Sequence, residues 1–209
     1  RLPRRDINGT IQAPLAYRVT STAPIIAYQF NPLENENVFS NDASLLLPAT
    51  LMGQEYIVMT REQTFDSLRS FLTVAAVLPG ETTVSVQVSG PTMVGAIYPG
   101  HPTDEEPIPH MEPGETRVFK LKQYDVINIE TDRPGADLTG SIILSSQRVA
   151  VFGGSEAANA PNTARCVDID PVTEKGVCEY DGLTECSTLM DCVNAGFNTC
   201  CADHLEQQL

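Results

Sequence analysis

The sequence predicts an all-β protein: an antiparallel β-sandwich with a small disulfide-rich segment appended to it. Apolar and polar residues alternate along several short segments, and these are separated by Pro, Gly, Asn and Asp. All six cysteines lie together near the C-terminal end, as in a disulfide-braced unit. Helical periodicity is nearly absent, although residues 64–70 could form one turn and residues 202–209 could begin a short helix.

The clearest strands are residues 82–88 and 116–122, in which apolar and polar side chains alternate as in a half-buried strand. A Pro-Gly-Glu turn precedes each of them. Residues 71–77 are nearly all apolar, which predicts a strand covered on both faces. In total we expect eleven strands, at residues 16–20, 24–30, 44–47, 55–60, 71–78, 82–88, 93–98, 116–122, 124–131, 141–144 and 149–152.

The chain divides into four predicted parts. Residues 1–14 form an N-terminal extension, 15–153 the β-sandwich domain, 154–201 a linker and cysteine-rich disulfide insertion, and 202–209 the start of a further segment. The small and polar stretch 153–162 is the expected linker, and the Pro- and acid-rich stretch 99–115 is an expected solvated loop. Because the chain begins with Arg1 and shows no export signal, we expect a truncated piece of a longer protein.

The charge of the chain limits its partners. Net charge is -14, from 27 acidic and 13 basic residues. An acidic surface repels phosphate backbones, which argues against nucleic acid as a partner. No apolar run approaches the ~20 residues of a membrane helix, so we expect no membrane insertion in this segment. The acidity suits the solubility of a secreted protein, with a cationic partner as the alternative.

The cysteines predict an oxidising environment, extracellular or at the cell surface. An even number with mixed spacings and no Cys-x-x-Cys pair favours three disulfides over the rival interpretation, a zinc site. Two of them are adjacent in the chain, with Cα atoms about 3.8 Å apart, closer than the usual ~4.4–6.8 Å of a bridge, so they should bond to different partners. The connectivity is otherwise open. The six disulfide candidates are Cys166, Cys178, Cys186, Cys192, Cys200 and Cys201.

No catalytic constellation is recognisable, and we expect neither an enzyme nor a cofactor. The spacing around Ser155 differs from a Gly-x-Ser-x-Gly nucleophile elbow, and His-Glu-x-x-His is absent. His204 has Asp203 and Glu206 nearby in the sequence and could act as a base, but a structural histidine bonded locally is the preferred interpretation. A sequon at Asn8 is meaningful only if the source glycosylates secreted proteins.

Two acidic segments are weak candidates for metal ligands. Asp168, Asp170 and Glu174 resemble part of a calcium loop but lack the third alternating ligand and the turn glycine, so surface carboxylates are favoured. In the acidic loop, imidazole and carboxylate groups occur together, but a proline-rich loop rarely preorganises ligands. The residues of this second segment are His101, Asp104, Glu105, Glu106, His110 and Glu112.

Several motifs resemble one known family, the N-terminal domain of IgGFc-binding proteins. The likeness is most specific at Gly153-Gly154 and at the Cys…Asp-His-Leu…Gln-Leu segment that ends the chain, and it covers most of the sequence. The resemblance implies a β-rich extracellular module of adhesive or mucus-associated proteins, with residues 166–200 as an insertion of the bacterial type. No residue is matched to an Fc contact. The remaining segments of likeness are residues 21–32, 41–48, 71–74, 123–131, 137–141 and 149–152.

We therefore expect a non-catalytic binding or adhesion module of a larger secreted or cell-surface protein. Its partners would be proteins or glycans at a cell surface or in an extracellular matrix, although a chain without Trp has few rings for sugar stacking. The alternatives are a structural building block of a surface assembly, which would self-associate, and a glycan-active enzyme. The ligand-binding residues cannot be named from the sequence.

Overall fold

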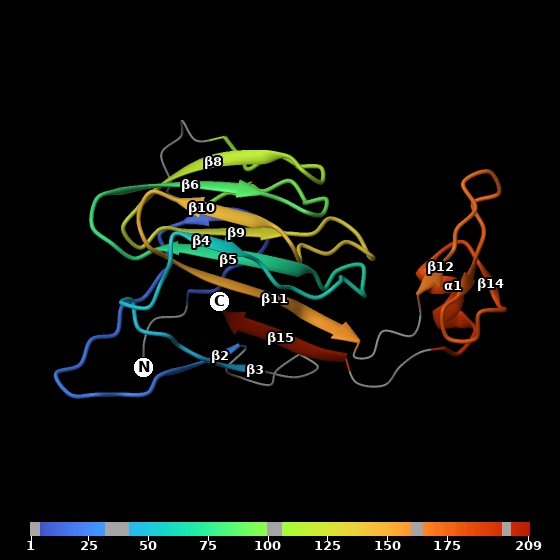
Figure 1. The fold of residues 1–209 in the computed structure, drawn as a ribbon, viewed down its shortest axis with the longest axis horizontal. Helices are drawn as coiled ribbons and strands as arrows, with labels where there is room; N and C mark the ends of the chain where they lie inside the picture. Colours follow the sequence, from blue (N-terminus) through green and yellow to red (C-terminus); the bar gives the residue numbers. More distant parts are fainter. Residues whose placement is uncertain (1–4, 32–41, 100–105, 160–164, 198–201) are drawn as a thin grey trace.

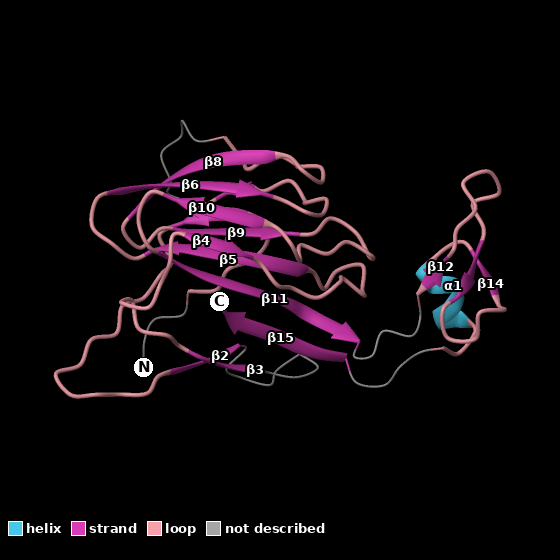
Figure 2. Cartoon of the chain, in the orientation of Figure 1, coloured by secondary structure: helices cyan, strands magenta, loops and turns pink. Residues whose placement is uncertain are grey.

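Two β-sheets pack face to face in this protein, and a small lobe lies beside them (Figures 1 and 2). The computed structural model describes residues 5–31, 42–99, 106–159, 165–197 and 202–209. Within these ranges the one α-helix is α1 (Leu189–Asn194), which lies in the lobe. The all-β prediction with a disulfide-bearing segment near the C-terminus is confirmed. Among the described residues, no helix has the length and apolar character needed to cross a membrane.

The larger sheet has six strands, and only one of its pairings is parallel, that of β1 with β7. The antiparallel neighbours are β15 with β11, β11 with β5, β5 with β9, and β9 with β1. In spatial order the strands are β15 (Ala202–Gln208), β11 (Val149–Asn159), β5 (Ser70–Ala76), β9 (Val126–Glu130), β1 (Ile11–Ala13) and β7 (Ala96–Ile97).

The smaller sheet has four strands, all antiparallel to their neighbours. The two segments with the clearest alternation lie side by side in it, with Val84 opposite Phe119. Alternate side chains of these strands are buried, as the period of two predicts. In spatial order the strands are β4 (Glu55–Ile57), β10 (Ile142–Ser145), β6 (Glu81–Gln87) and β8 (Thr116–Lys122).

The core lies between the two sheets and is almost wholly aliphatic. From the larger sheet, Leu72, Val74 and Ile127 point into it, and from the smaller sheet Val86 and Leu121 do. Each of these side chains is fully buried. Burying a side chain of this size contributes about 1.5–3 kcal/mol, so this interior is the main source of stability.

The other face of the larger sheet is also covered in part. Ala75, Val126 and Ala150 form a second apolar cluster with Ile11 and Ala13 of the N-terminal region. The strand β5 is therefore buried on both faces, which confirms the expectation from its apolar sequence. The strand that comes first in the sequence, β1, lies within residues 1–14, which we predicted as an N-terminal extension. This part of the predicted extension therefore belongs to the larger sheet.

The linker predicted at residues 153–162 is wrong for its first part, because β11 continues to Asn159. A glycine pair allows this. A Cβ on Gly153 would lie 2.1 Å from the carbonyl oxygen of Met59, and one on Gly154 would lie 2.1 Å from the carbonyl oxygen of Leu205. Neighbouring backbones therefore approach β11 more closely than any side chain would permit.

Other local predictions are also corrected. Residues 202–208 form the strand β15 rather than a helix, and their buried positions alternate although the side chains at those positions are polar. Residues 16–20 form no strand, because nearly all of them are exposed and no neighbouring strand pairs with them in the described ranges. Instead of the helical turn expected at residues 64–70, residues 65–68 form bends and Ser70 begins β5. Of the strand expected at residues 93–98, only the two residues of β7 (Ala96–Ile97) are in a strand.

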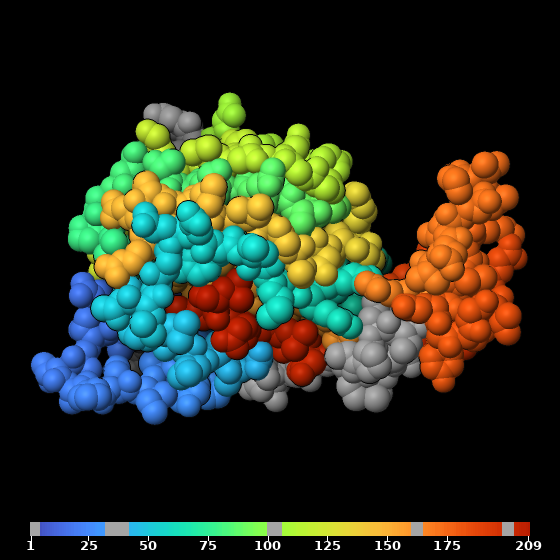
Figure 3. Space-filling view, viewed as in Figure 1, coloured from blue at the N-terminus to red at the C-terminus, as the bar shows by residue number. Residues whose placement is uncertain are grey.

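A hairpin and the lobe complete the described structure. The hairpin pairs β2 (Tyr28–Asn31) with β3 (Asp42–Leu45) and lies next to β15. The lobe contains β12 (Cys166–Val167), β13 (Gly176–Cys178), β14 (Glu185–Cys186) and α1. In sequence it stands between β11 and β15, which are neighbours in the sheet, so the lobe is inserted into the sandwich and projects from it (Figure 3).

Candidate binding surfaces

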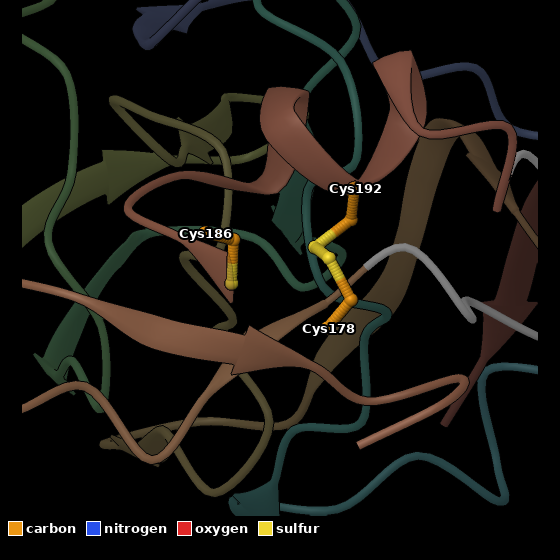
Figure 4. A group of neighbouring side chains, drawn as sticks. All are labelled: Cys178, Cys186 and Cys192. Carbon is orange, nitrogen blue, oxygen red and sulfur yellow. A yellow bond between two sulfur atoms is a disulfide. The ribbon is translucent and has the colours of Figure 1, made fainter. Parts of the chain in front are cut away.

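Two disulfide bonds brace the lobe. Cys166 is bonded to Cys186. Cys178 is bonded to Cys192, and Figure 4 shows this second bridge with Cys186 beside it. The sulfur atoms of Cys178, Cys186 and Cys192 lie within 4.8 Å of one another, close enough for metal ligands, but each belongs to a disulfide. Cys200 and Cys201 lie outside the described residues, so the prediction of a third bridge stays a prediction.

The acidic residues proposed as a calcium loop form a tight turn in the lobe. The Oδ1 atom of Asp170 accepts hydrogen bonds from the backbone N–H groups of Val172 and Thr173, at 2.8 and 2.9 Å. Both hydrogen bonds lower the pKa of Asp170, that from Thr173 more strongly than that from Val172. Asp168 and Glu174 both have positive φ angles, of 55° and 56°. The carboxylates thus shape the turn, and among the described residues these three do not converge on a common point.

The acidic loop is only partly solvated, contrary to our prediction. Ile108 and Met111 are buried because their side chains pack into the core between the two sheets. His110 lies between them in sequence, with Nδ1 2.5 Å from the carbonyl oxygen of Thr92 and Nε2 3.0 Å from Oε1 of Glu112. Both contacts, that with Glu112 first, raise the pKa of His110. His101, Asp104 and Glu105 lie outside the described residues.

His204 lies on the face of β15 that points away from the core between the sheets, and its side chain is buried there. Its Nδ1 atom lies 3.0 Å from the carbonyl oxygen of Glu156, and its Nε2 atom lies 3.7 Å from Oε2 of Glu206. The ring stacks on Phe71 with centroids 6.2 Å apart. Burial alone would lower the pKa of His204, but the interactions with Glu206 and with the Glu156 carbonyl outweigh it and raise the pKa. These contacts fit a histidine that fastens β15 to its surroundings.

A polar clamp, which we define as Gln29, Asn31, Asp42, Ser44 and Glu206, holds the hairpin against β15. The carboxylate of Glu206 accepts hydrogen bonds from the side-chain amides of Gln29 and Asn31, both at 2.6 Å. Its backbone N–H donates to the carboxylate of Asp42 at 2.9 Å, and its carbonyl accepts from Ser44 Oγ at 2.5 Å. The clamp covers an edge of β15 with side chains instead of another strand.

A second buried polar group lies further along the same sheet face. Glu130 is 5% exposed, and its Oε1 atom accepts a hydrogen bond from Asn128 at 3.0 Å. Burial raises the pKa of Glu130 from 4.5 to about 7; repulsion by Glu156 adds to the rise, while Arg69 opposes it. Thr10, the last residue of the sequon, is buried beside it and accepts a hydrogen bond from the Glu130 backbone. Thr10 therefore has a structural role independent of glycosylation.

The outward face of the four-stranded sheet carries four apolar side chains that the described chain leaves exposed, among polar residues of the same strands. Ile57 of β4 lies directly opposite Ile142 of β10, and both point to solvent. Leu144 is 49% exposed on the same strand, and Val118 is 60% exposed on β8. We call these four side chains the outer apolar face. Ile57, Ile142 and Leu144 are neighbours on β4 and β10, whereas Ser85 of β6 lies between Leu144 and Val118. Clusters of exposed apolar side chains are found at interaction sites.

The lobe carries a second set of exposed apolar side chains. They sit on its turns and short helix, where the disulfides hold the backbone. These residues are Ile169, Val172, Tyr180, Leu183 and Met190.

A hollow lies where the edges of the two sheets meet. It has a volume of ≈ 290 Å³ and is lined by residues of β7 and β8 with Gln12 and Ile108 between them. The side-chain amide of Gln12 crosses it and donates a hydrogen bond to the backbone carbonyl of Lys120 at 3.0 Å. The hollow is too open to enclose a small ligand, but it follows the edge of β8.

Taken together, these features define a β-sandwich whose buried polar groups mostly serve the fold and which leaves apolar side chains exposed on the four-stranded sheet and on the lobe. The IgGFc binding protein family model matches residues 42–177. Because this match covers well over half of the chain, the protein belongs to that family. No curated protein and no solved structure matches the chain.

The sequence motifs that suggested this family meet in space. The glycine pair of β11 contacts β15, and β15 carries the Glu206 that binds the hairpin. The clamp itself was missed, because nothing in the sequence spacing connects Asn31 with Glu206. Its one visible trace is the run of polar residues at alternate buried positions of β15.

Proposed function

We propose that this chain is an extracellular, non-catalytic binding or adhesion module of a larger secreted or cell-surface protein. The observation that carries the proposal is the outer apolar face, which combines Ile57, Ile142, Leu144 and Val118 on one rigid sheet. A protein surface is the partner such a face suits, since apolar side chains on a strand scaffold are ordered before they bind. The family name adds support, and immunoglobulin Fc is accordingly one partner to test.

The polar groups support a binding role over catalysis. Three of the titratable side chains with several close partners, Glu206, His204 and Glu130, are buried within contacts that fasten one strand to the next. A catalytic acid or base must instead reach a substrate in a cleft. Extracellular placement is supported by the two disulfide bonds, which persist in oxidising compartments.

An array of immunoglobulin Fc, matrix proteins and glycans tests the proposal. We expect the wild-type chain to bind at least one protein on it, and the double variant Ile142→Lys/Leu144→Lys to bind at least about tenfold more weakly, since two charges would be placed in the contact. The control is Val172→Lys, which adds a charge to an exposed apolar position of the lobe. Equal binding by the double variant, or no binding combined with hydrolysis of a glycan, would overturn the proposal.

The alternative function is a structural building block of a surface assembly. The same apolar face could then contact a second copy of the chain. Light scattering over a range of concentrations separates the two functions: a chain that stays monomeric while it binds a protein on the array supports the module, and concentration-dependent association supports the building block.

A further inference from the structure

The edge of β8 has backbone groups that no described strand uses. In β6, the backbone of Thr83 bonds to Ser146, so its neighbours Thr82 and Val84 direct their N–H and C=O groups to β8. They pair there with Leu121 and Phe119. Because backbone direction alternates along a strand, the N–H and C=O of Val118 and the N–H of Lys120 point away from the sheet, along the hollow.

One group on this edge already binds an amide. The carbonyl of Lys120 accepts a hydrogen bond from the side chain of Gln12 at 3.0 Å, where the N–H of an added strand would lie. Gln12 therefore shows that this edge is open to an amide donor. It also marks one end of the unused stretch, which extends from Thr116 to Lys120.

The charge of this edge is opposite to that of the whole molecule. Arg117, Lys120 and Lys122 are three of the chain's 13 basic residues, and β8 contains no acidic residue. Lysines on an edge strand normally prevent pairing between copies, and two β8 strands side by side would repel each other. Lys120 contacts Glu81 at 3.4 Å, but both side chains are well exposed, so this ion pair is weak and exchangeable.

The two sides of the edge differ in character. On the outward side, Val118 and Lys120 are exposed and would lie next to alternate side chains of an added strand. On the inward side, the apolar side chains of Ile97, Ile108 and Phe119 line the hollow, together with the charged residues Glu106 and Arg117. A strand that fits both sides has acidic residues at one set of alternate positions and apolar residues at the other.

We propose that the edge of β8 binds an extended, acidic segment of a partner protein as an additional strand. The backbone of that segment pairs with Val118 and Lys120, its carboxylates lie beside Lys120 and Lys122, and its apolar side chains enter the hollow. This mode is β-strand addition, in which backbone bonds supply affinity and alternate side chains supply specificity. The inference rests on the proposed function, since it names the chemistry of a protein partner next to the outer apolar face.

The test uses a synthetic peptide with glutamate and valine in alternation over seven residues, the length of β8. Its charge-reversed counterpart has lysine in place of glutamate. Fluorescence anisotropy with the whole chain should show binding of the acidic peptide only. Val118→Pro removes the central N–H donor of the edge and should weaken binding about tenfold or more. Lys120→Glu with Lys122→Glu should abolish the preference for the acidic peptide.

The chain offers a matched control on the opposite edge of the same sheet. The backbone carbonyl of Gln54 accepts a hydrogen bond from the N–H of Ser145 in β10, so the N–H of its neighbour Glu55 points away from the sheet. Glu55→Pro thus makes the same backbone change on the other edge strand, outside the outer apolar face, and should leave peptide binding unchanged. Circular dichroism and thermal melting verify that both variants fold.

Three results would overturn the inference: no binding of the acidic peptide, equal binding of both peptides, or an equal loss of peptide binding in Glu55→Pro and Val118→Pro. These outcomes are distinguishable from failure of the proposed function. If the array partner still binds the Val118→Pro variant and requires Ile142 and Leu144, the module function stands and only strand addition fails.

Discussion

Glu130 is the residue whose protonation is most closely coupled to folding. It lies in β9 with all five residues of the strand buried, and its pKa is raised from 4.5 to about 7 mainly by that burial. A carboxyl group whose pKa rises on folding binds a proton more tightly in the folded state. Its contribution to stability is therefore complete below pH 4.5 and is lost as the pH rises towards 7.

We predict that Glu130→Gln removes this part of the pH dependence. Relative to the variant, the wild-type chain should lose stability between pH 4.5 and 7, by up to ~3 kcal/mol, because each unit of pKa shift corresponds to about 1.4 kcal/mol. Urea unfolding at several pH values measures the difference. Glu55→Gln, at an exposed position of β4, is the control and should leave the pH profile in place. Identical profiles for wild type and Glu130→Gln would show that Glu130 titrates normally.

Gly153 is the residue where the backbone leaves no room for a side chain. We expect Gly153→Ala to destabilise the protein by roughly 1–3 kcal/mol or more, since its Cβ would meet the Met59 carbonyl at 2.1 Å and one of the two backbones must move. Thermal unfolding measures the effect. Gly53→Ala is the matched control, because the nearest atom to its Cβ would be at 3.6 Å, an ordinary contact. Equal melting temperatures for the two variants would contradict the close approach.

Among the elements, the hairpin β2–β3 depends most on a single side chain. We predict that Glu206→Gln loosens it, because an amide cannot accept hydrogen bonds at both of its ends from Gln29 and Asn31. A buried donor left without its partner costs about 1–3 kcal/mol. Hydrogen exchange of the β2 and β3 amides should accelerate by roughly tenfold or more while β5 and β9 stay protected.

The control for the hairpin is Glu81→Gln, which removes an exposed carboxylate far from it in the fold and should not change its exchange. Acceleration spread equally over all strands would indicate global destabilisation instead of a local clamp.

Elements were predictable where burial follows apolar residues. The alternation in β6 and β8 and the continuous apolar run of β5 located those strands, because one or both faces contact the core. The strand β15 was missed since polar side chains, among them Glu206, occupy its buried positions. Pairings between distant residues, such as β1 with β9, lie beyond what a local pattern encodes.

At the scale of the whole molecule, a sandwich without cysteines carries an inserted lobe that depends on them. No cysteine precedes Cys166, and the two described bridges join cysteines that are 20 and 14 positions apart in the lobe. Arg165, which directly precedes β12 at the start of the lobe, forms a hydrogen-bonded ion pair with Glu62 of the sandwich. Its Nε atom lies 2.7 Å from Oε2 of Glu62.

We predict that reduction unfolds the lobe while the sandwich stays folded. Each bridge contributes ~2–4 kcal/mol to the lobe, whose own apolar core is small. Amide exchange after reduction should increase across residues 166–197 and remain slow in β5, β9 and β11. The double variant Cys178→Ala/Cys192→Ala should reproduce the effect without reductant. A single cooperative transition that includes both parts would contradict this division.

The candidate binding surfaces were less predictable than the fold. Ile57, Val118, Ile142 and Leu144 come from three separate segments, and each one alone is an ordinary exposed residue. Only the register of β4, β10, β6 and β8 places them on one face. The cysteines, in contrast, were evident from their number and clustering, although which of them pair required the structure.

Hydrogen-exchange mapping of the chain bound to a protein partner tests the central claim most directly. Amides of β4, β10 and β8 should become protected on binding, because these strands carry the outer apolar face and the free edge. Protection confined to the lobe at residues 166–197, or the absence of any protein that binds the chain, would contradict the assignment of the sandwich as the recognition surface.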